Sequence, residues 1–334
     1  MSRPTRFSVY GAGSWGTALA IQLARNGINT LLWGHRRDRL NEYSSANKNI
    51  DYLPEIDFPH SLRCNDNLKV LAEHSQHHLI VVPSHGFRQL LSQLEPLLNS
   101  HHKILWATKG LELDSGKLLH QLVEETLPKI TDYGVVSGPT FAVEVAKGLP
   151  TAMTVAATSQ QLAEEAADAF QSSTYRVYTS DDIIGVELGG AVKNVLAIAA
   201  GITDGLGLGA NARTALITRG FAEIIRLGQS MGAKSETLMG LSGIGDLILT
   251  CTDDQSRNRQ LGLALGAGKS LDQAIKDIGQ AVEGAKTSQS IHQLAQRAGV
   301  EMPICYAVHQ ILYEDLSPQA AVECLISRQT KSEF

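Results

Sequence analysis

The chain has 334 residues, a length that suits two domains better than one compact core. Hydrophobic residues make up 43% of it and charged residues 19%, which indicates a folded globular protein and excludes a disordered one. The formal net charge of −5 argues against a nucleic-acid-binding protein, because such proteins usually carry a basic excess.

Cysteine usage and hydropathy bear on the cellular compartment. The four cysteines lie far apart and form no C-x-x-C pair (Cys64, Cys251, Cys305 and Cys324), which favours a reduced cytoplasmic protein over a disulfide scaffold or zinc module. Only residues 183–202 approach the length and apolarity of a membrane span. They include Glu187 and Lys193, and each charge costs roughly 2.5–3.5 kcal/mol at the bilayer centre. We therefore expect a buried helix there, in a protein that does not span a membrane.

Short β-rich runs alternate with helical patterns in the first half of the chain. A helix is predicted at residues 14–25, where Asn26-Gly27 is typical of a helix end. Strands are predicted at residues 6–10, 28–33, 79–83, 103–108, 134–137 and 152–156. Strands that alternate with helices predict an α/β fold with a parallel, doubly wound sheet.

A glycine-rich turn, GAGSWG, joins the first predicted strand to the first helix. Gly11 permits the tight turn, Gly13 lets a pyrophosphate approach the backbone, and Gly16 lets the helix pack closely on the strand. The amino end of the helix would then face the phosphates. This G-x-G-x-x-G pattern is weak alone, but its position between a strand and a helix near the amino terminus predicts a dinucleotide site in a Rossmann-like domain. The alternative is a glycine-rich turn without a ligand.

The end of the second predicted strand bears on cofactor choice. NAD sites usually place a carboxylate there to bind the ribose 2′-hydroxyl, whereas this chain reads Gly34-His35-Arg36-Arg37. A guanidinium suits a 2′-phosphate, so we favour NADP(H), with NAD(H) as the other candidate. The alternative is that these arginines lie in a solvated loop and the site accepts either cofactor.

The run ATKG follows the strand predicted at residues 103–108. Ligands bind at the carboxyl ends of the strands in open α/β sheets, so Lys109 is expected to face the substrate.

The pattern changes near residue 181, where long helical stretches replace the β-rich runs. We predict a dinucleotide-binding domain over residues 1–181 and an all-helical substrate domain over residues 182–334. The helices of this second domain are predicted at residues 182–202, 210–231, 256–266, 271–277, 285–298 and 303–314.

Lys193 lies in the apolar run LGGAVKNVLAIAAGI. Its helical neighbours Leu196, Ala197 and Ala200 form a small apolar face, so the lysine either snorkels to solvent or points into a cavity with a partner. Desolvation would lower its pKa toward neutrality and make it a usable general acid or base. Asn194 lies about 100° around the helix and could line the same pocket. A paired structural lysine remains the alternative.

A second polar run, GIGDLILTCTDDQSRN, follows later in the chain. Asp246 is a plausible partner for a buried ammonium. Ser256, Arg257 and Asn258 stand where a helix begins, so its amides with these side chains could bind an anion. The alternative is that Ser256 only caps the helix and Arg257 lies on the surface.

No metal site is predicted. His74, His77 and His78 have ligand-like spacing, but they lie in a polar stretch that offers no cysteine partner. We interpret them as surface histidines in a polar loop.

With these residues in view, the chain resembles the bacterial NAD(P)-dependent glycerol-3-phosphate dehydrogenases over nearly its whole length. The matching runs follow the order of that family, and the AVKN and SRN blocks are specific to it and its near relatives. The runs are GAGSWGTALA, VPSHGFRQLL, ATKGLE, SGPTFAVEVAKGLPTA, ELGGAVKNVLAIAAGITDGLGLGANARTALITRG, LSGIGDLILTCTDDQSRNRQLG and VEGAKT.

The resemblance implies roles for individual residues. Lys193 would accept the proton when the C2 hydroxyl is oxidised, and Asp246 with Lys109 would set the electrostatics around it. The residues implied for the substrate are Lys109, Gly138, Thr140, Lys193, Asn194, Asp246, Ser256, Arg257 and Asn258. Those implied for the cofactor, with the glycine turn, are Gly11, Gly13, Ser14, Trp15, Gly16, His35, Arg36, Lys109, Ala142, Arg257 and Glu283.

The expected protein is thus a cytoplasmic homodimer that interconverts dihydroxyacetone phosphate and sn-glycerol 3-phosphate for glycerophospholipid synthesis. Two alternatives remain at this point. One is a β-hydroxyacid dehydrogenase of similar architecture, which would need a cationic site for a carboxylate. The other is a non-catalytic NADP(H) sensor, which the presence of Lys193 argues against.

Overall fold

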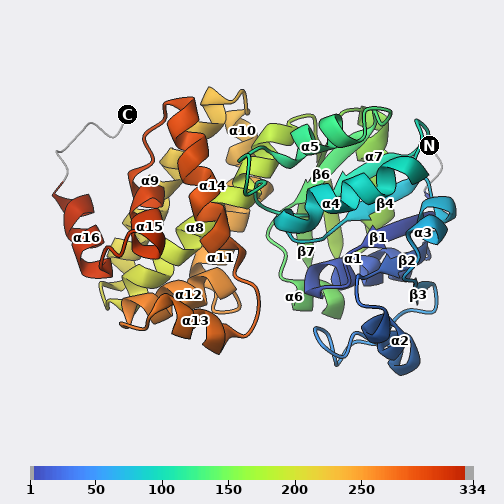
Figure 1. Cartoon of the computed structure of the whole chain (residues 1–334), viewed down its shortest axis with the longest axis horizontal. Coiled ribbons are helices and arrows are strands. Elements are labelled where there is room, and N and C mark those ends of the chain that lie inside the picture. The colour runs from blue at the N-terminus through green and yellow to red at the C-terminus, as the bar shows by residue number, and fades with distance from the viewer. Residues whose placement is uncertain (1–3, 328–334) are drawn as a thin grey trace.

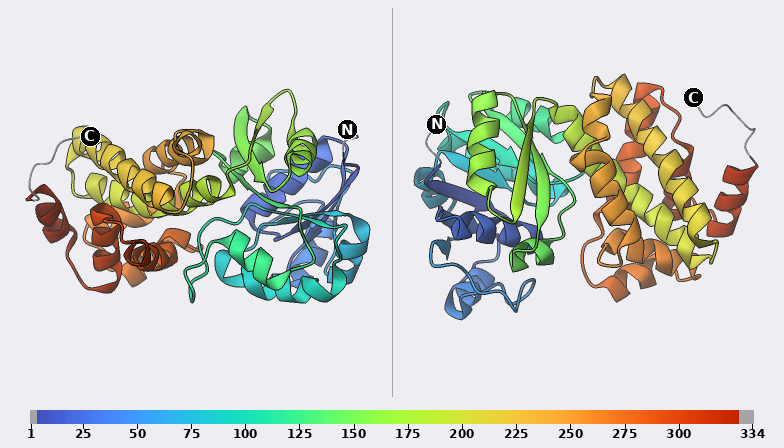
Figure 2. Two further views of the ribbon diagram at one scale, coloured as in Figure 1. Left: turned by 90° about the horizontal axis from the view of Figure 1, so that it is seen from above. Right: turned by 180° about the vertical axis from the view of Figure 1, so that it is seen from behind.

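The computed structural model describes residues 4–327, which form two lobes (Figure 1). The amino-terminal lobe is a sheet covered by helices, and the carboxyl-terminal lobe is helical. The two further views show that the lobes lie side by side (Figure 2). The first and last described residues lie at opposite ends of the molecule.

One eight-stranded sheet forms the centre of the amino-terminal lobe. Its strand order, β3-β2-β1-β4-β5-β6-β7-β8, reverses direction next to β1, as in doubly wound folds. All neighbouring strands are parallel except β6 and β7, which pair antiparallel, so the sheet is mixed where the sequence predicted a parallel one. The strands are β1 (Arg6–Tyr10), β2 (Asn29–Trp33), β3 (Leu62–Cys64), β4 (His77–Ile80), β5 (Lys103–Trp106), β6 (Tyr133–Ser137), β7 (Thr151–Ala157) and β8 (Tyr175–Ser180).

Helices cover both faces of this sheet and bury a separate apolar cluster on each. Helices α1, α6 and α7 pack on one face, and α3, α4 and α5 pack on the other. Their bounds are α1 (Ser14–Arg25), α2 (Arg37–Ala46), α3 (Leu68–His74), α4 (Ser84–Leu94), α5 (Leu119–Thr126), α6 (Ala142–Lys147) and α7 (Gln160–Phe170), with a short 3₁₀ turn η1 (Glu95–Leu97).

Helix α8 (Ile183–Gly205) is the central element of the carboxyl-terminal lobe. Asp182 caps its amino end, because the side chain accepts from the Gly185 amide at 2.8 Å, and the helix residues from Gly185 to Thr203 are buried. Around it lie α9 (Gly209–Ser230), α10 (Ser235–Leu238), the π-helical turn η2 (Leu241–Gly245), α11 (Asp246–Thr252), α12 (Arg257–Gly266), α13 (Leu271–Ile278), α14 (Glu283–Ala298), α15 (Pro303–Tyr313) and α16 (Pro318–Ile326).

Helix α8 is the one helix within residues 4–327 that is long and apolar enough to cross a membrane. However, 89% of its most apolar window is buried inside the protein, as the sequence led us to expect for a core helix.

Glycines let α8 approach its neighbours closely. A Cβ added to Gly262 of α12 would lie 2.0 Å from the Ile198 carbonyl oxygen, and one added to Gly201 of α8 would lie 2.2 Å from the Arg259 carbonyl oxygen. The backbones of α8 and α12 therefore touch, and larger residues at these positions would separate them.

The sequence located six of the eight strands, helix α1 and six helices of the second lobe. It expected helical patterns between the strands but gave no bounds for α2 to α7, and it missed β3 and β8, the antiparallel pairing of β7, and the short helices α10, α11 and α16. It also misjudged the histidine run, because His77 and His78 lie on β4 rather than in a polar loop. His78 is fully buried and its Nδ1 lies 2.9 Å from the Tyr10 hydroxyl, so the interpretation as surface histidines was wrong for it. The hydrogen bond satisfies one ring nitrogen of this buried side chain, whereas Nε2 has no partner among the described residues.

Candidate functional site

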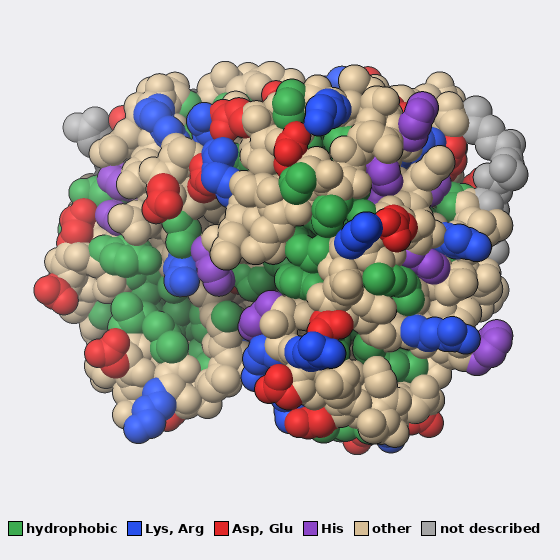
Figure 3. Space-filling view, turned by 45° about the vertical axis from the view of Figure 1, so that its right-hand side comes forward, with side chains coloured by type: hydrophobic (Ala, Val, Ile, Leu, Met, Phe, Trp, Pro, Cys, Tyr) green, Lys and Arg blue, Asp and Glu red, His purple; other side chains and the backbone are tan. Residues whose placement is uncertain are grey.

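A pocket of about 200 Å³ is lined by residues of both lobes. The space-filling view shows the molecule hollowed between the lobes, with Lys and Arg side chains interspersed with Asp and Glu on the right-hand side of the hollow (Figure 3). Many predicted site residues line this pocket: Ser14, Trp15, Lys109, Thr140, Ala142, Lys193, Asn194, Ser256, Arg257, Asn258 and Glu283.

Two lysines share one buried carboxylate beside the pocket. Lys193 Nζ donates to Asp246 Oδ1 at 2.5 Å, and Lys109 Nζ donates to Asp246 Oδ2 at 2.6 Å. Asp246 is 1% exposed, so water does not screen the interaction of its carboxylate with the two ammonium groups. A carboxylate and two ammonium groups are therefore held together at the point where the lobes meet.

The position of Lys193 follows from the glycines that precede it on α8. A Cβ on Gly190 would lie 2.9 Å from the Ser137 hydroxyl at the end of β6, and one on Gly189 would lie 2.4 Å from the Ser242 carbonyl oxygen of η2. Only glycine allows α8 to pass between these two segments. The run LGGAVKN thereby brings the lysine to the carboxyl edge of the sheet.

Burial lowers the pKa of Lys193 to about 8. The loss of hydration is the main cause; the positive charge of Lys109 acts in the same direction, while Asp246 partly opposes it. A lysine with such a pKa can both accept and donate a proton near neutral pH.

Thr250 completes the set around Lys193 and was not predicted from the sequence. Its hydroxyl accepts from Lys193 Nζ at 2.8 Å and donates to the Asp246 carbonyl oxygen at 2.6 Å. It stands one helical turn after Asp246 on α11, so the i, i+4 spacing was the signal that could have indicated it.

The glycine turn has the geometry that a pyrophosphate requires. Gly11 adopts a positive φ of 126°, and a Cβ on Gly16 would lie 1.9 Å from the Gly11 carbonyl oxygen, so β1 and α1 pack as closely as the motif predicts. A Cβ on Gly13 would meet nothing within 4 Å, and no side chain caps the α1 amino end there. The buried Trp15 Nε1 has no hydrogen-bond partner among the described residues. Free amides and this indole donor fit a bound dinucleotide.

His35 and Arg36 follow β2 and are exposed; they do not line the pocket. The Arg36 side chain is 52% exposed, and its Nη2 lies 3.6 Å from Asp51 Oδ2. Arg37 forms its own ion pair with Asp66 at 3.1 Å. Arg36 therefore has the longer ion-pair distance of the two arginines.

The amino end of α12 borders the pocket on the helical side. Ser256 caps this helix by accepting from the Arg259 amide at 3.3 Å. This agrees with the alternative, raised from the sequence, that Ser256 is a helix cap. Arg257 is exposed and makes one long contact, Nη1 to Gln280 Oε1 at 3.3 Å. Its guanidinium can therefore reach an anion without breaking a strong ion pair.

Asn258 is held by two bonds that also fix Asn194. Its Nδ2 donates to Asn194 Oδ1 at 2.9 Å, and its Oδ1 accepts from the Gly284 amide at 2.9 Å. These bonds join α12, α8 and the start of α14. Beside them, burial raises the pKa of the Glu283 carboxyl, although Arg257, Lys109 and Lys193 act in the opposite direction.

The segment after β6 supplies the remaining predicted residues. Gly138 has a φ of 157°, and its carbonyl oxygen accepts from the Thr140 hydroxyl at 3.1 Å and from Lys109 Nζ at 3.4 Å. Ala142 begins α6 at the pocket wall. Among residues 4–327 no group of three or more His, Cys, Asp or Glu side chains is placed to hold a metal ion.

Comparison with known proteins identifies the family. The sequence profiles described as the N-terminus and C-terminus of NAD-dependent glycerol-3-phosphate dehydrogenase match residues 6–163 and 182–323. A curated relative from Thioalkalivibrio sulfidiphilus, named glycerol-3-phosphate dehydrogenase [NAD(P)+], is 55% identical over the full length of both chains. The chain belongs to the NAD-dependent glycerol-3-phosphate dehydrogenase family.

Solved structures agree with this membership of the glycerol-3-phosphate dehydrogenase family. The enzyme of that name from Coxiella burnetii is 47% identical, with a TM-score of 0.94 over 97% of this chain and 99% of its own. The enzyme from Saccharomyces cerevisiae is 27% identical, with a TM-score of 0.84 over 98% and 100% of the two chains. The resemblance inferred from the sequence motifs is confirmed, as is the predicted two-part α/β architecture.

Proposed function

We propose that this chain is an NAD(P)-dependent sn-glycerol-3-phosphate 2-dehydrogenase. The observation that carries the proposal is the buried Lys193–Asp246–Lys109 set at the junction of a dinucleotide-type turn and a helical lobe. The matching names of the relatives support it. The reaction interconverts dihydroxyacetone phosphate and sn-glycerol 3-phosphate, the precursor of the glycerophospholipid backbone.

Lys193 is the proposed acid and base of this reaction. The nicotinamide cofactor supplies or accepts the hydride when it is bound. Only one proton then remains to be moved, so Lys193 in its neutral form accepts the proton of the C2 hydroxyl and in its charged form returns one to the carbonyl oxygen. Asp246 and Thr250 hold its Nζ in place, and burial keeps its pKa low, with a smaller contribution from the positive charge of Lys109.

The substrate phosphate is proposed to bind at the amino end of α12. Its backbone amides favour an anion, Arg257 can form charge-assisted hydrogen bonds, and Asn258 is already fixed by Asn194. Binding the phosphate away from the reacting carbon orients the substrate. We assign to substrate binding Lys109, Gly138, Thr140, Lys193, Asn194, Asp246, Ser256, Arg257 and Asn258.

The dinucleotide is proposed to run from the glycine turn to the Lys193 pocket. Its contacts would be Gly11, Gly13, Ser14, Trp15, Gly16, His35, Arg36, Lys109, Ala142, Arg257 and Glu283. A preference for NADP(H) over NAD(H) is part of the proposal, supported by the exposed Arg36 guanidinium after β2. In this arrangement residues 1–181 supply most of the dinucleotide contacts and residues 182–334 supply most of the substrate contacts, and each domain also contributes residues to the other ligand.

We also propose that the protein acts as a cytoplasmic homodimer. Its four cysteines are all free in the described structure. The helical lobe carries a groove of about 1250 Å³ between α9, the segment before α15, α15 and α16; its lining is mostly apolar, includes the charged residues Arg219, Glu223, Arg226 and Glu301, and contains Ile326, which is 79% exposed. A large exposed apolar surface of this kind supports an association between copies of the chain.

The activity is tested by supplying NADPH with dihydroxyacetone phosphate or with small 3-oxo acids. Rapid oxidation of NADPH by the phosphate alone is expected. Turnover of the 3-oxo acids alone would instead identify a β-hydroxyacid dehydrogenase, and no turnover would leave a cofactor sensor.

The role of Lys193 is tested with Lys193→Ala. We expect kcat to fall by roughly 10²–10⁴-fold while cofactor affinity is kept, because only the proton acceptor is lost. Lys129→Ala, which removes a 64% exposed lysine, is the control and should be active. Activity of Lys193→Ala within about tenfold of the unchanged enzyme would contradict the assignment.

A further inference from the structure

Residues 109–118, here called the strap, join β5 to α5 and belong to both lobes. The strap leaves the sheet of the amino-terminal lobe, yet Leu111 and Leu118, each 1% exposed, are buried in the apolar core of the helical lobe with residues of α8. Lys109 at its start contacts Asp246. The strap is therefore a covalent link between the sheet and the helical core that carries one of the two lysines.

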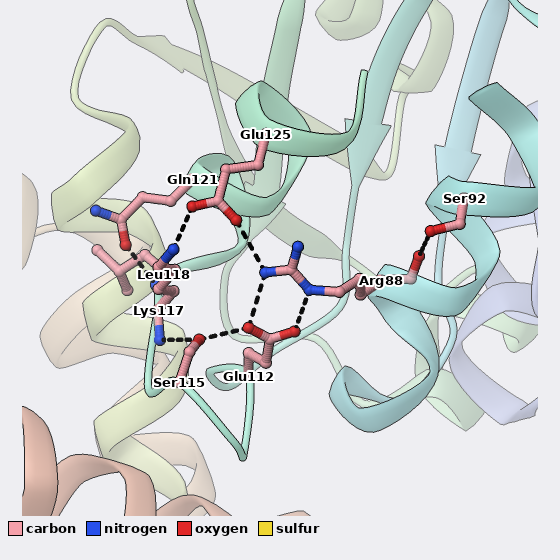
Figure 4. A network of polar contacts seen from close by, with 8 residues as sticks. All are labelled: Arg88, Ser92, Glu112, Ser115, Lys117, Leu118, Gln121 and Glu125. Atoms are coloured by element: carbon pink, nitrogen blue, oxygen red, sulfur yellow. Dashed lines mark hydrogen bonds and ion pairs between the residues drawn. The ribbon is translucent and has the colours of Figure 1, made fainter. Parts of the chain in front are cut away.

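A network of charges anchors the strap to the amino-terminal lobe (Figure 4). Arg88 of α4 donates through Nε and Nη2 to the two oxygens of Glu112, the latter at 2.9 Å, and Nη2 also contacts Glu125 at 2.9 Å. Lys117 pairs with Glu125 of α5. The Glu112 side chain is 13% exposed and the Arg88 side chain 40% exposed, so the carboxylate of this bidentate pair is shielded from solvent while the guanidinium is partly open to it.

Glu112 also closes the strap on itself. Its amide donates to the Lys117 carbonyl oxygen at 3.0 Å, the Gly116 amide donates to the Glu112 carbonyl oxygen at 2.8 Å, and its carboxylate accepts from the Ser115 hydroxyl. From the helical lobe, Arg297 of α14 donates to the carbonyl oxygens of Ser115 at 2.6 Å and Gly116 at 3.1 Å. The strap is thus fixed from both sides.

Little freedom remains between Glu112 and Lys109. Leu111 is buried, and Gly110 adopts a φ of 109° between the lobes, where an added Cβ would lie 3.3 Å from the Thr287 hydroxyl and 3.5 Å from the Ser84 hydroxyl. The place of Glu112 therefore determines the place of the Lys109 backbone, and with it the reach of Lys109 Nζ to Asp246.

We propose that Glu112 is a positioning residue: paired with Arg88, it holds the strap so that Lys109 stays on Asp246 beside Lys193. The inference rests on the proposed function, since it concerns the same two lysines. It assigns a role in catalysis to a carboxylate that does not line the pocket.

The charge on Lys109 gives the proposal a measurable consequence. The titratable and charged groups that surround Lys193 are Asp246 and Cys251 of α11, Lys109 of the strap and Glu283 at the start of α14. If Lys109 moves away, Lys193 loses a neighbouring positive charge and no longer shares the Asp246 carboxylate with a second ammonium. Both changes favour the protonated form, so the pKa of Lys193 rises from about 8.

The test is the pH profile of kcat/KM for glycerol 3-phosphate oxidation in Glu112→Gln, which keeps the size of the side chain and removes its charge. Because oxidation needs neutral Lys193, the acid limb should move to higher pH by about half to one unit. The conservative variant Glu112→Asp keeps the charge, so its acid limb should lie close to that of the unchanged enzyme. An acid limb that does not move in Glu112→Gln overturns the proposal.

Glu165→Gln is the matched control. Glu165 is a glutamate of similar exposure, 11%, that also accepts from two basic groups, Lys103 and His77, but lies outside the strap. Its loss should affect stability without moving the acid limb. An equal shift in this variant would show a general effect of weakened packing and would also overturn the proposal.

Hydrogen exchange separates this inference from the proposed function. The Glu112 and Gly116 amides, which are bonded within the strap, should exchange at least tenfold faster in Glu112→Gln than in Glu165→Gln. Equal exchange in the two variants refutes the positioning role whatever the activity. An unchanged enzyme that does not oxidise glycerol 3-phosphate refutes the proposed function instead.

Discussion

Lys193 lies in an environment that lets a lysine exchange its proton near neutral pH. It is 6% exposed, its Nζ is fixed by Asp246 and Thr250, and a second ammonium shares the same carboxylate. An isolated buried ammonium would cost several kcal/mol, whereas this one has hydrogen-bond partners and a counter-ion. In this arrangement the free-energy difference between charged and neutral Lys193 is small near neutral pH, as proton transfer requires.

The pH dependence of both reaction directions follows from this lysine. With a pKa near 8, oxidation of glycerol 3-phosphate should lose about tenfold in kcat/KM for each pH unit below 8, because the neutral base disappears. Reduction of dihydroxyacetone phosphate should instead decline as the pH rises above 8, because the proton donor disappears. Steady-state profiles in both directions check this; an oxidation limb below pH 6 would show that another group titrates.

Arg36 is the residue on which the cofactor preference depends. Replacing it in Arg36→Ala removes a half-exposed guanidinium after β2, so kcat/KM with NADPH should fall at least about tenfold, while kcat/KM with NADH should change little. Arg37→Ala is the matched control, since Arg37 is paired with Asp66. Equal values with NADPH before and after the Arg36 change would show that this side chain does not bind a 2′-phosphate.

At the scale of elements, the crossing of α8 and α12 positions the site. Helix α8 carries Lys193 and Asn194, and α12 begins with the proposed phosphate cradle. Their backbones meet at Gly201 and Gly262, and a bond from Asn258 to Asn194 joins them near the pocket. The distance between the proposed proton acceptor and the proposed phosphate site therefore depends on the glycines at this crossing.

Gly262→Ala tests this crossing. The added methyl would lie 2.0 Å from the Ile198 carbonyl oxygen, so the helices must separate, and we expect a loss of about 1–3 kcal/mol or more in unfolding free energy with a raised KM for the phosphate substrate. Gly86→Ala in α4 is the control, because a Cβ there meets nothing within 4 Å and alanine favours a helix. Denaturant unfolding and steady-state kinetics measure both effects; equal stability of the two variants would argue against the close crossing.

At the scale of the whole molecule, the strap and α8 connect the lobes. The strap places two leucines in the helical core, and α8 begins directly after the last strand, β8. A further link is His120 of α5, whose amide and Nδ1 both contact the buried Glu187 of α8. The strap begins at Lys109, and Glu187 lies on the same helix as Lys193, so these links involve the segments that carry the two lysines.

The proposed homodimer makes a prediction at the same scale. Ile326→Asp places a charge in the mostly apolar groove, so the dimer should dissociate at micromolar concentration, because burying an unpaired carboxylate is costly. Leu149→Asp, which charges a 46% exposed position in the other lobe, should leave the association state unchanged. Sedimentation velocity distinguishes these outcomes, and a dimer that persists in Ile326→Asp would place the interface elsewhere.

The sequence by itself determined features that depend on near neighbours along the chain. Helical spacing predicted α8 and the unusual place of Lys193, and the glycine pattern predicted the turn between β1 and α1, because these signals need only a few consecutive residues. The remaining site residues were predicted from the resemblance to the family motifs. Short edge strands such as β3 and brief helices such as α10 gave too few residues for a periodic signal.

Only the tertiary structure decided which distant residues meet. Lys193 and Asp246 are 53 positions apart and Lys109 and Asp246 are 137 apart, so no local pattern could set their distances. Likewise, β7 turned antiparallel and His78 became buried through pairing with other strands. The same holds for the strap: Leu111 and Arg297 join it to the helical lobe through packing, which depends on how whole elements fit together rather than on the residues beside them.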